Sequence, residues 1–173
     1  MSSSSIAAWF GRSASAGIVA ALVILSGCQV QPLYSETSPA AHSLGSIAFS
    51  DAKDRVSQEV RNHLIFLTAG GAGEPANPEY RVDLRVKTVS SGVLLERSSD
   101  TAKAGRVVVS ADYTVTRTGD ATVLRAGHRQ AVALVDYPAQ EFAKLRAIRD
   151  AENRAARQLA ELIRADLAAV LGR

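Results

Sequence analysis

Apolar and polar positions alternate along two central segments of the chain. In residues 80–89, aromatic or aliphatic side chains occupy the even positions as far as Val86, and charged ones occupy the odd positions as far as Lys87. Residues 106–117 alternate as well, with apolar side chains at the odd positions from Val107 to Val115. A period of two is typical of a strand with one buried face and one face in water. Both segments are therefore predicted to be half-buried strands.

Two further segments predict the remaining strands of a sheet. The short apolar run 44–49 favours a first strand. Residues 118–120, with the sequence Thr-Gly-Asp, carry a hairpin-turn signal, and residues 123–135 are predicted to return as a fourth strand in which Gly127 marks a bulge. Residues 90–103 contain polar clusters and a glycine, so they are predicted to be a long connection.

Apolar residues at helical spacing predict two helices. The first spans residues 51–67, where Ser50-Asp51 offers an N-cap and Gly70-Gly71 offers a stop. Its stripe consists of Val56, Val60, Leu64 and Leu67. A second amphipathic helix is predicted from Gln140 nearly to the terminus. Its stripe consists of Leu145, Ile148, Ala155, Leu159, Leu162 and Val170.

The order of these elements is strand, helix, three strands, helix, without strict alternation of strands and helices. This order favours an α+β fold, in which an antiparallel-rich sheet of about four strands has two helices packed on one face. Residues 44–173 are predicted to form this single domain. An apolar content of 47% with 21% charged residues is ordinary for a folded domain.

The start of the chain resembles a lipoprotein signal peptide. An apolar run of ten residues, 16–25, is too short to span a bilayer but suits the central region of a signal peptide. Leu25-Ser26-Gly27-Cys28 follows, which resembles the bacterial lipobox, and Cys28 is the only cysteine of the chain. Residues 1–27 are predicted to be removed, with lipid attached to Cys28. Residues 28–43 are predicted to be an extended, lipidated tether.

Charge and motif content argue against several classes of function. A formal net charge of +3 is far smaller than the basic excess typical of nucleic-acid binders. His42, His63 and His128 are not at metal-ligand spacing from other candidate ligands. The chain has no G-x-S-x-G motif and no phosphate-binding glycine loop with its lysine. These observations predict a protein that is not an enzyme and binds no metal or cofactor.

The residues that follow the lipobox carry a family resemblance. Cys28 is followed closely by Pro32-Leu33-Tyr34, which resembles the start of the LPS-assembly lipoproteins of the LptE family. The segment 107–119 and the last helix, with Asp150-Ala151-Glu152 and Arg154-Ala155-Ala156, look like alphaproteobacterial members. The family's domain, a sheet of about four strands with two helices on one side, agrees with the elements predicted above.

This resemblance implies a non-enzymatic lipoprotein of the outer membrane. Members sit inside the β-barrel protein LptD, help it assemble, and contact lipopolysaccharide (LPS) as it passes outward. Gln29, after the cysteine, resembles the signal for transfer to the outer membrane. LPS presents phosphates and acyl chains, so a binding surface needs exposed cations. The wet face of the strand 80–89 offers Arg81, Arg85 and Lys87, with Arg125, His128 and Arg129 as possible neighbours.

Other interpretations of the same sequence remain open at this point. The three cations also suit an ordinary solvated sheet face, and Asp83 lies between them. An auxiliary lipoprotein of an ABC-type lipid transporter would combine a lipobox with a small α+β domain as well. A lipid-anchored periplasmic hydrolase would need a nucleophile and a base, for which the sequence offers no recognisable motif.

Overall fold

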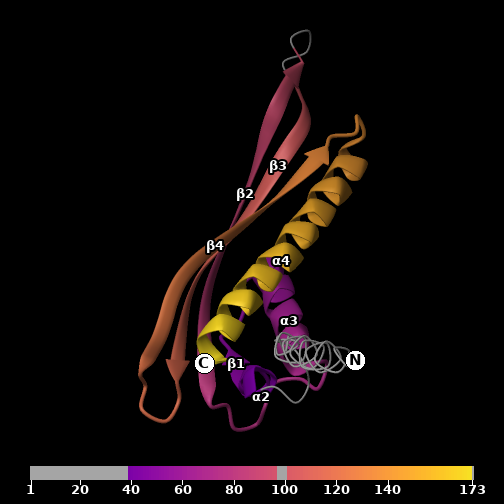
Figure 1. The fold of residues 1–173 in the computed structure, drawn as a ribbon. Helices are drawn as coiled ribbons and strands as arrows, with labels where there is room; N and C mark the ends of the chain where they lie inside the picture. Colours follow the sequence, from indigo (N-terminus) through magenta and orange to yellow (C-terminus); the bar gives the residue numbers. More distant parts are fainter. Residues whose placement is uncertain (1–38, 97–100, 173) are drawn as a thin grey trace, which may run out of the picture. The chain divides into compact units, whose positions relative to one another are not determined.

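The computed structural model describes residues 39–96 and 101–172 (Figure 1). The signal peptide, Cys28 and most of the predicted tether lie outside these residues. The elements, in chain order, are α2 (Pro39–Gly45), β1 (Ile47–Phe49), α3 (Arg55–Ala69), β2 (Tyr80–Glu96), β3 (Thr101–Arg117), β4 (Val123–Asp136) and α4 (Glu141–Leu171).

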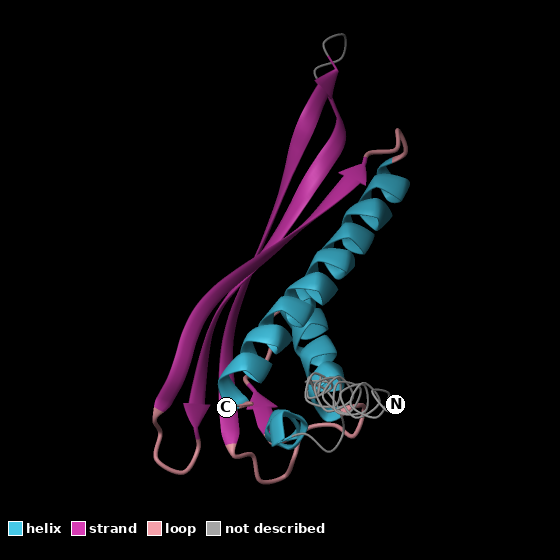
Figure 2. Ribbon diagram, viewed as in Figure 1, coloured by secondary structure: helices cyan, strands magenta, loops and turns pink. Residues whose placement is uncertain are grey.

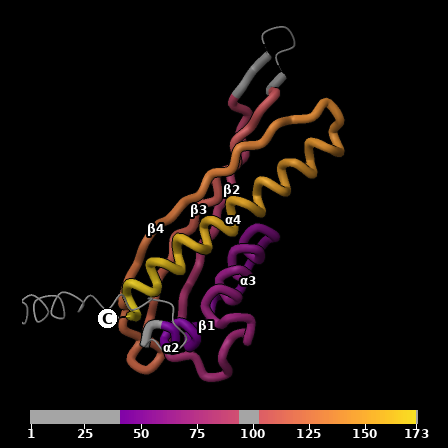
Figure 3. Tube along the Cα trace, turned by 45° about the vertical axis from the view of Figure 1, so that its right-hand side comes forward, coloured from indigo at the N-terminus to yellow at the C-terminus, as the bar shows by residue number. Residues whose placement is uncertain are grey.

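The four strands form one sheet in the order β1-β2-β3-β4. β1 is parallel to β2, whereas β2–β3 and β3–β4 are antiparallel pairs, so the sheet is mixed but mostly antiparallel. The long helices α3 and α4 lie on the same face of this sheet (Figure 2). They also pack against each other, and α4 runs along β3 and β4 (Figure 3). The predicted α+β class is therefore confirmed.

The core lies between the sheet and the two long helices, α3 and α4. The odd positions of β3 from Val107 to Val115 point into it, as the period of two predicts, and all five are buried. Opposite them, α4 presents alanines, which let the helix approach the sheet closely, together with Leu159, Ile163 and Leu167, which are fully buried. Each of these larger side chains contributes roughly 1.5–3 kcal/mol by its burial.

The helix predicted for residues 51–67 is α3, and it begins later than predicted, at Arg55. Ser50 does not cap it, because its Oγ accepts a hydrogen bond from the backbone N of Leu84 at 2.9 Å. Asp54 is the N-cap of α3, since its carboxylate accepts hydrogen bonds from the backbone N of Ser57 at 2.9 Å and from its Oγ at 2.7 Å. These bonds lower the pKa of Asp54. The predicted stop is confirmed, because Gly70 adopts the left-handed conformation at φ 59°.

The prediction for residues 90–103 was wrong. β2 continues to Glu96 and β3 already begins at Thr101, with Ser90 opposite Val107 and irregular pairing between Gly92 and Leu95. Backbone pairing between two long strands extends the ladder through serines and a glycine, although both residue types are common in loops. The local composition therefore did not reveal these strand residues.

Four smaller predictions also need correction. The run 44–49 is not all strand, because β1 begins only at Ile47 and Leu44 belongs to α2 and lies in the core. The predicted tether is not extended throughout, because α2 begins within it, at Pro39. Gly127 does not mark a bulge, since the register shift of this pair lies between Val115 and Thr116. The buried face of α4 is rotated from the predicted stripe, because Leu145 and Leu162 are exposed.

Candidate ligand-binding face

The three predicted cations lie on the face of the sheet opposite the helices, here called the outer face. On β2, Val82 is buried and its alternate neighbours are half-buried against the helices, so Arg81, Arg85 and Lys87 point to solvent. Arg81 is partly neutralised, because its Nε lies 3.6 Å from Oδ1 of Asp83. Arg85 and Lys87 form no recorded ion pair within residues 39–96 and 101–172.

The strand register determines which neighbours share this face. Arg85 lies opposite Asp112 on β3, and Asp112 lies opposite His128 on β4. Oδ1 of Asp112 is 2.8 Å from Nδ1 of His128, so this carboxylate already has a partner. His128 therefore joins the outer face as the sequence suggested. Arg85 is exposed, and Asp112, paired with it across the strands, offsets part of its positive charge.

Arg125 and Arg129 lie on the helix side of the sheet instead. Arg129 donates from Nε and Nη2 to the two carboxylate oxygens of Asp166 on α4, each at 2.7 Å, and the hydroxyl of Tyr113 donates to the same carboxylate at 2.6 Å. The hydrogen bonds from Arg129 hold the pKa of Asp166 below its usual value. Burial, followed by the bond to Asp166, raises the pKa of Tyr113. This cluster binds α4 to the sheet, so its arginine is not part of the outer face.

An exposed apolar patch lies beside the cations on the outer face. The register aligns three valines across the sheet, and Leu134 follows on β4 opposite Arg106. We call this set the outer apolar patch: Val89, Val108, Val132 and Leu134. Val89 is 48% exposed, Val132 44% and Leu134 69%. An antiparallel sheet normally carries polar side chains on its wet face, so these residues are unusual.

The sequence contained a signal for this patch. Residues 131–135 are apolar at every position, although an antiparallel strand with one wet face should alternate. Ala131, Ala133 and Val135 are buried under α4, which leaves Val132 and Leu134 for the outer face. Lys87 lies two residues before Val89, so cationic and apolar groups adjoin on this surface. This combination suits an anionic amphiphile.

The described part of the chain offers little for other chemistries. It contains no group of three His, Cys, Asp or Glu side chains that could hold a metal ion. Within the same residues, no helix combines the length and the apolar character needed to cross a membrane.

Comparison with known proteins identifies the family. The LptE family model, described as Lipopolysaccharide-assembly, matches residues 44–167, which is most of the chain. The chain therefore belongs to the LptE family. A search of curated proteins found no match. The LptE family is a non-enzymatic lipoprotein family, and membership in it supports a role for this chain in LPS assembly.

Solved structures show the same fold. A chain from Caulobacter crescentus, described as a proposed lipoprotein, superimposes with a TM-score of 0.63 at 22% identity, covering 76% of this chain and 95% of that one. The rare lipoprotein B of Shewanella oneidensis has a TM-score of 0.50 at 16% identity, covering 71% of this chain and 92% of its own. At such identities the likeness shows the fold alone.

Proposed function

We propose that this protein is an outer-membrane lipoprotein of the LPS transport machinery, anchored by lipid on Cys28, that partners the LptD β-barrel and assists the insertion of LPS at the cell surface. Family membership supports this proposal and favours it over an auxiliary lipoprotein of an ABC-type transporter. The observation that supports direct contact with LPS is that Arg85 and Lys87 adjoin the outer apolar patch on the outer face.

The outer face can divide its contacts between the two parts of LPS. Arg85 and Lys87 are two residues apart on one strand, so their stems lie about 7 Å apart and can engage neighbouring phosphates. Acyl chains would cover Val132 and Leu134, since burying exposed apolar surface is favourable at about 25 cal/mol per Å². Asp83 offsets part of the charge through Arg81, so Arg85 and Lys87 carry most of the attraction.

The test is LPS binding by the soluble, unlipidated domain carrying Arg85→Glu and Lys87→Glu. We expect affinity to fall about tenfold or more, because each lost charge-assisted hydrogen bond costs roughly 1.5–3 kcal/mol. The melting temperature should change little, since both side chains are on the surface. The double variant Arg146→Glu and Arg149→Glu, with the same change in charge on exposed residues of α4, is the control. Equal losses of LPS affinity in both double variants would show that the net charge matters and the position of the cations does not.

Partnership with the barrel is tested by photo-crosslinking in cells. A photoreactive amino acid at Gln130 on the outer face, and another at Gln58 on α3, should reveal which surface contacts the partner. We expect LptD as the principal adduct of at least one position, and depletion of the lipoprotein should lower the amount of correctly assembled barrel. An inner-membrane transporter subunit as the principal adduct, with normal barrel levels, would instead favour the ABC-type alternative.

A further inference from the structure

Only part of β2 has a neighbouring strand on both sides. β1 covers Tyr80 to Val82, and Ser50 adds one more bond through its Oγ, which accepts from the backbone N of Leu84. Beyond this point β2 continues to Glu96 with β3 on one side. In the described segments, nothing pairs with the other side. β2 therefore has an open edge from Val86 onward.

The direction of the backbone groups can be deduced from the bonds around them. Val82 accepts from the backbone N of Ser50, so even-numbered residues of β2 point their N–H and C=O toward β1. Glu79 accepts from the backbone N of Thr118 after β3, so odd-numbered residues point the other way. Because this direction alternates along a strand, Val86, Thr88 and Ser90 present their N–H and C=O groups at the open edge.

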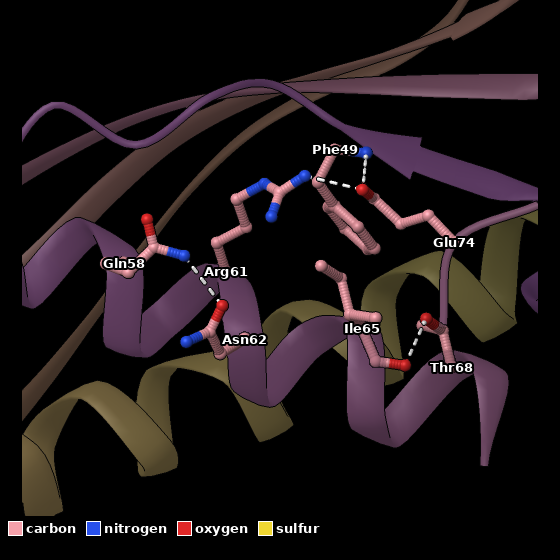
Figure 4. Close-up of polar contacts among 7 residues, drawn as sticks. All are labelled: Phe49, Gln58, Arg61, Asn62, Ile65, Thr68 and Glu74. Carbon is pink, nitrogen blue, oxygen red and sulfur yellow. Dashed lines mark hydrogen bonds and ion pairs between the residues drawn. The ribbon is translucent and has the colours of Figure 1, made fainter. Parts of the chain in front are cut away.

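Each of the other two edges of the sheet carries one side-chain cap. Glu74, from the loop after α3, accepts a hydrogen bond from the backbone N of Phe49 on β1 at 2.8 Å, and it also pairs with Arg61 (Figure 4). On β4, Nη2 of Arg154 donates to the carbonyl of Leu134 at 2.8 Å. No such cap is recorded for Val86 to Ser90. An uncovered sheet edge is a template for another strand.

A pocket lies directly beside this edge. It has a volume of about 270 Å³ and is lined by the segment 50–54, Ser57, Arg61 and residues 84–86. Leu84 and Val86 are only partly buried and pack against the core, so an apolar side chain from an added strand would extend the core here. Pairing at an edge combined with a side-chain pocket is the arrangement by which domains bind extended peptides.

Charge selects among the possible strands. Arg85 and Lys87 flank Val86 on the outer face, where a second copy of this chain paired edge to edge would bring cations against cations. Opposite charges directly across a strand pair contribute roughly 0.2–1 kcal/mol, and like charges destabilise it. On the inner side, Lys53 and Asp51 both line the pocket with opposite charges, and the carboxylate of Asp54 is occupied as the cap of α3. The preference for an acidic strand therefore comes from Arg85 and Lys87 on the outer face.

We propose that the open edge of β2, from Val86 to Ser90, binds an extended strand of a partner protein that is acidic on its outer side and apolar on the side facing the pocket. The strand adds next to β2 beyond the end of β1, and its main chain bonds to Val86, Thr88 and Ser90. This site adds backbone groups and the pocket to Arg85 and Lys87, so an acidic strand would compete with LPS for these two cations, whereas the backbone N–H of Thr88 belongs to strand binding alone.

Hydrogen exchange of the unlipidated domain tests the edge. In the free domain, the amides of Val86, Thr88 and Ser90 should exchange at least tenfold faster than those of Lys87 and Val89, which point toward β3. A synthetic capped peptide, Gly-Val-Glu-Val-Glu-Val-Gly, should slow the even-numbered amides and bind at least tenfold more tightly than its version with lysine in place of glutamate. Equal exchange of odd and even amides, equal binding of the two peptides, or dimerisation through this edge would overturn the proposal.

Thr88→Pro provides the specific variant. It removes one outward N–H while leaving the bonds to β3, and proline is tolerated on edge strands in that orientation. We expect Thr88→Pro to lose at least tenfold in affinity for the acidic peptide while LPS binding stays unchanged, and Thr88→Ala, which keeps the N–H, to bind the peptide normally. Unaltered peptide binding by Thr88→Pro would overturn the proposal. If that variant does not fold, the exchange pattern of the unmodified domain decides.

Discussion

Replacing Cys28 with alanine is expected to abolish incorporation of labelled palmitate into the protein. Cys28 is the only cysteine of the chain, so no other thiol can accept the diacylglycerol. Without that modification the precursor should keep its signal peptide, and the larger form should accumulate. Each methylene of an acyl chain that is buried in the membrane contributes about 0.8 kcal/mol, so several acyl chains together anchor the protein stably. Loss of the cysteine should therefore abolish lipid anchoring completely.

The matched control is Gln29→Ala, which leaves the thiol and the preceding Leu25-Ser26-Gly27 in place and should still be labelled. Mass spectrometry of the mature N-terminus gives a second, independent readout. Label on the alanine variant at position 28, or a mature protein that begins elsewhere, would contradict the proposed anchor.

Faces of strands were predictable from the sequence, whereas their lengths were not. Side chains alternate with a period of two, so the burial of Val107 and Val109 and the exposure of Arg85 followed from the pattern alone. Where a strand ends depends on whether another strand pairs with it. Ser90 and Gly92 lie in β2 because β3 supplies the partner backbone, and a single-strand pattern contains no information on that pairing.

The helices show the same division between local and tertiary causes. Gly70 ended α3 where predicted, because a left-handed cap is a local property of the backbone. The buried face of α4 depends on which side meets the sheet, and there the close approach favours Ala151 and Ala156 over the exposed Leu145. The predicted stripe was right for Ala155 and Leu159, which are fully buried, but it also included the exposed Leu145 and Leu162, because a hydrophobic stripe weights leucine above alanine.

The candidate site was partly predictable for the same reason. Arg81, Arg85 and Lys87 share one strand, so their common face followed from spacing. The assignment of Arg129 to that face was wrong, because its direction depends on the register between β3 and β4 and on Asp166 of α4. The open edge of β2 depends on the three-residue length of β1, which tertiary pairing determines.

Replacing Gly127 with alanine is expected to lower the free energy of unfolding by about 2–3 kcal/mol, in the range for overpacking a core. A Cβ at this position would lie 2.4 Å from the hydroxyl oxygen of Tyr113 and 2.5 Å from its Cζ. The ring cannot move aside cheaply, because Tyr113 is 2% exposed and its hydroxyl donates to Asp166. Relief therefore requires breaking that bond or shifting β4.

Gly105→Ala provides the matched control, since Gly105 also lies under a tyrosine ring, with its added Cβ 1.9 Å from the hydroxyl oxygen of Tyr137. Tyr137 is only partly buried after the end of β4, at the margin of the core, and Nζ of Lys144 lies 5.3 Å from its ring centroid, so the ring can turn toward solvent at the cost of a few core contacts and a weak cation–π contact. We expect Gly105→Ala to cost about 1 kcal/mol or less. Urea unfolding of the unlipidated domain measures both variants.

A double-mutant cycle then tests whether the Tyr113 ring is the cause of the Gly127 effect. In a Tyr113→Leu background the clashing ring atoms are gone, so Gly127→Ala should cost well under 1 kcal/mol, and the coupling energy between the two positions should be about 1–3 kcal/mol. A full penalty in the leucine background would assign the effect to the backbone of β4 instead, and similar penalties for Gly105→Ala and Gly127→Ala would contradict the argument from the fixed Tyr113 ring.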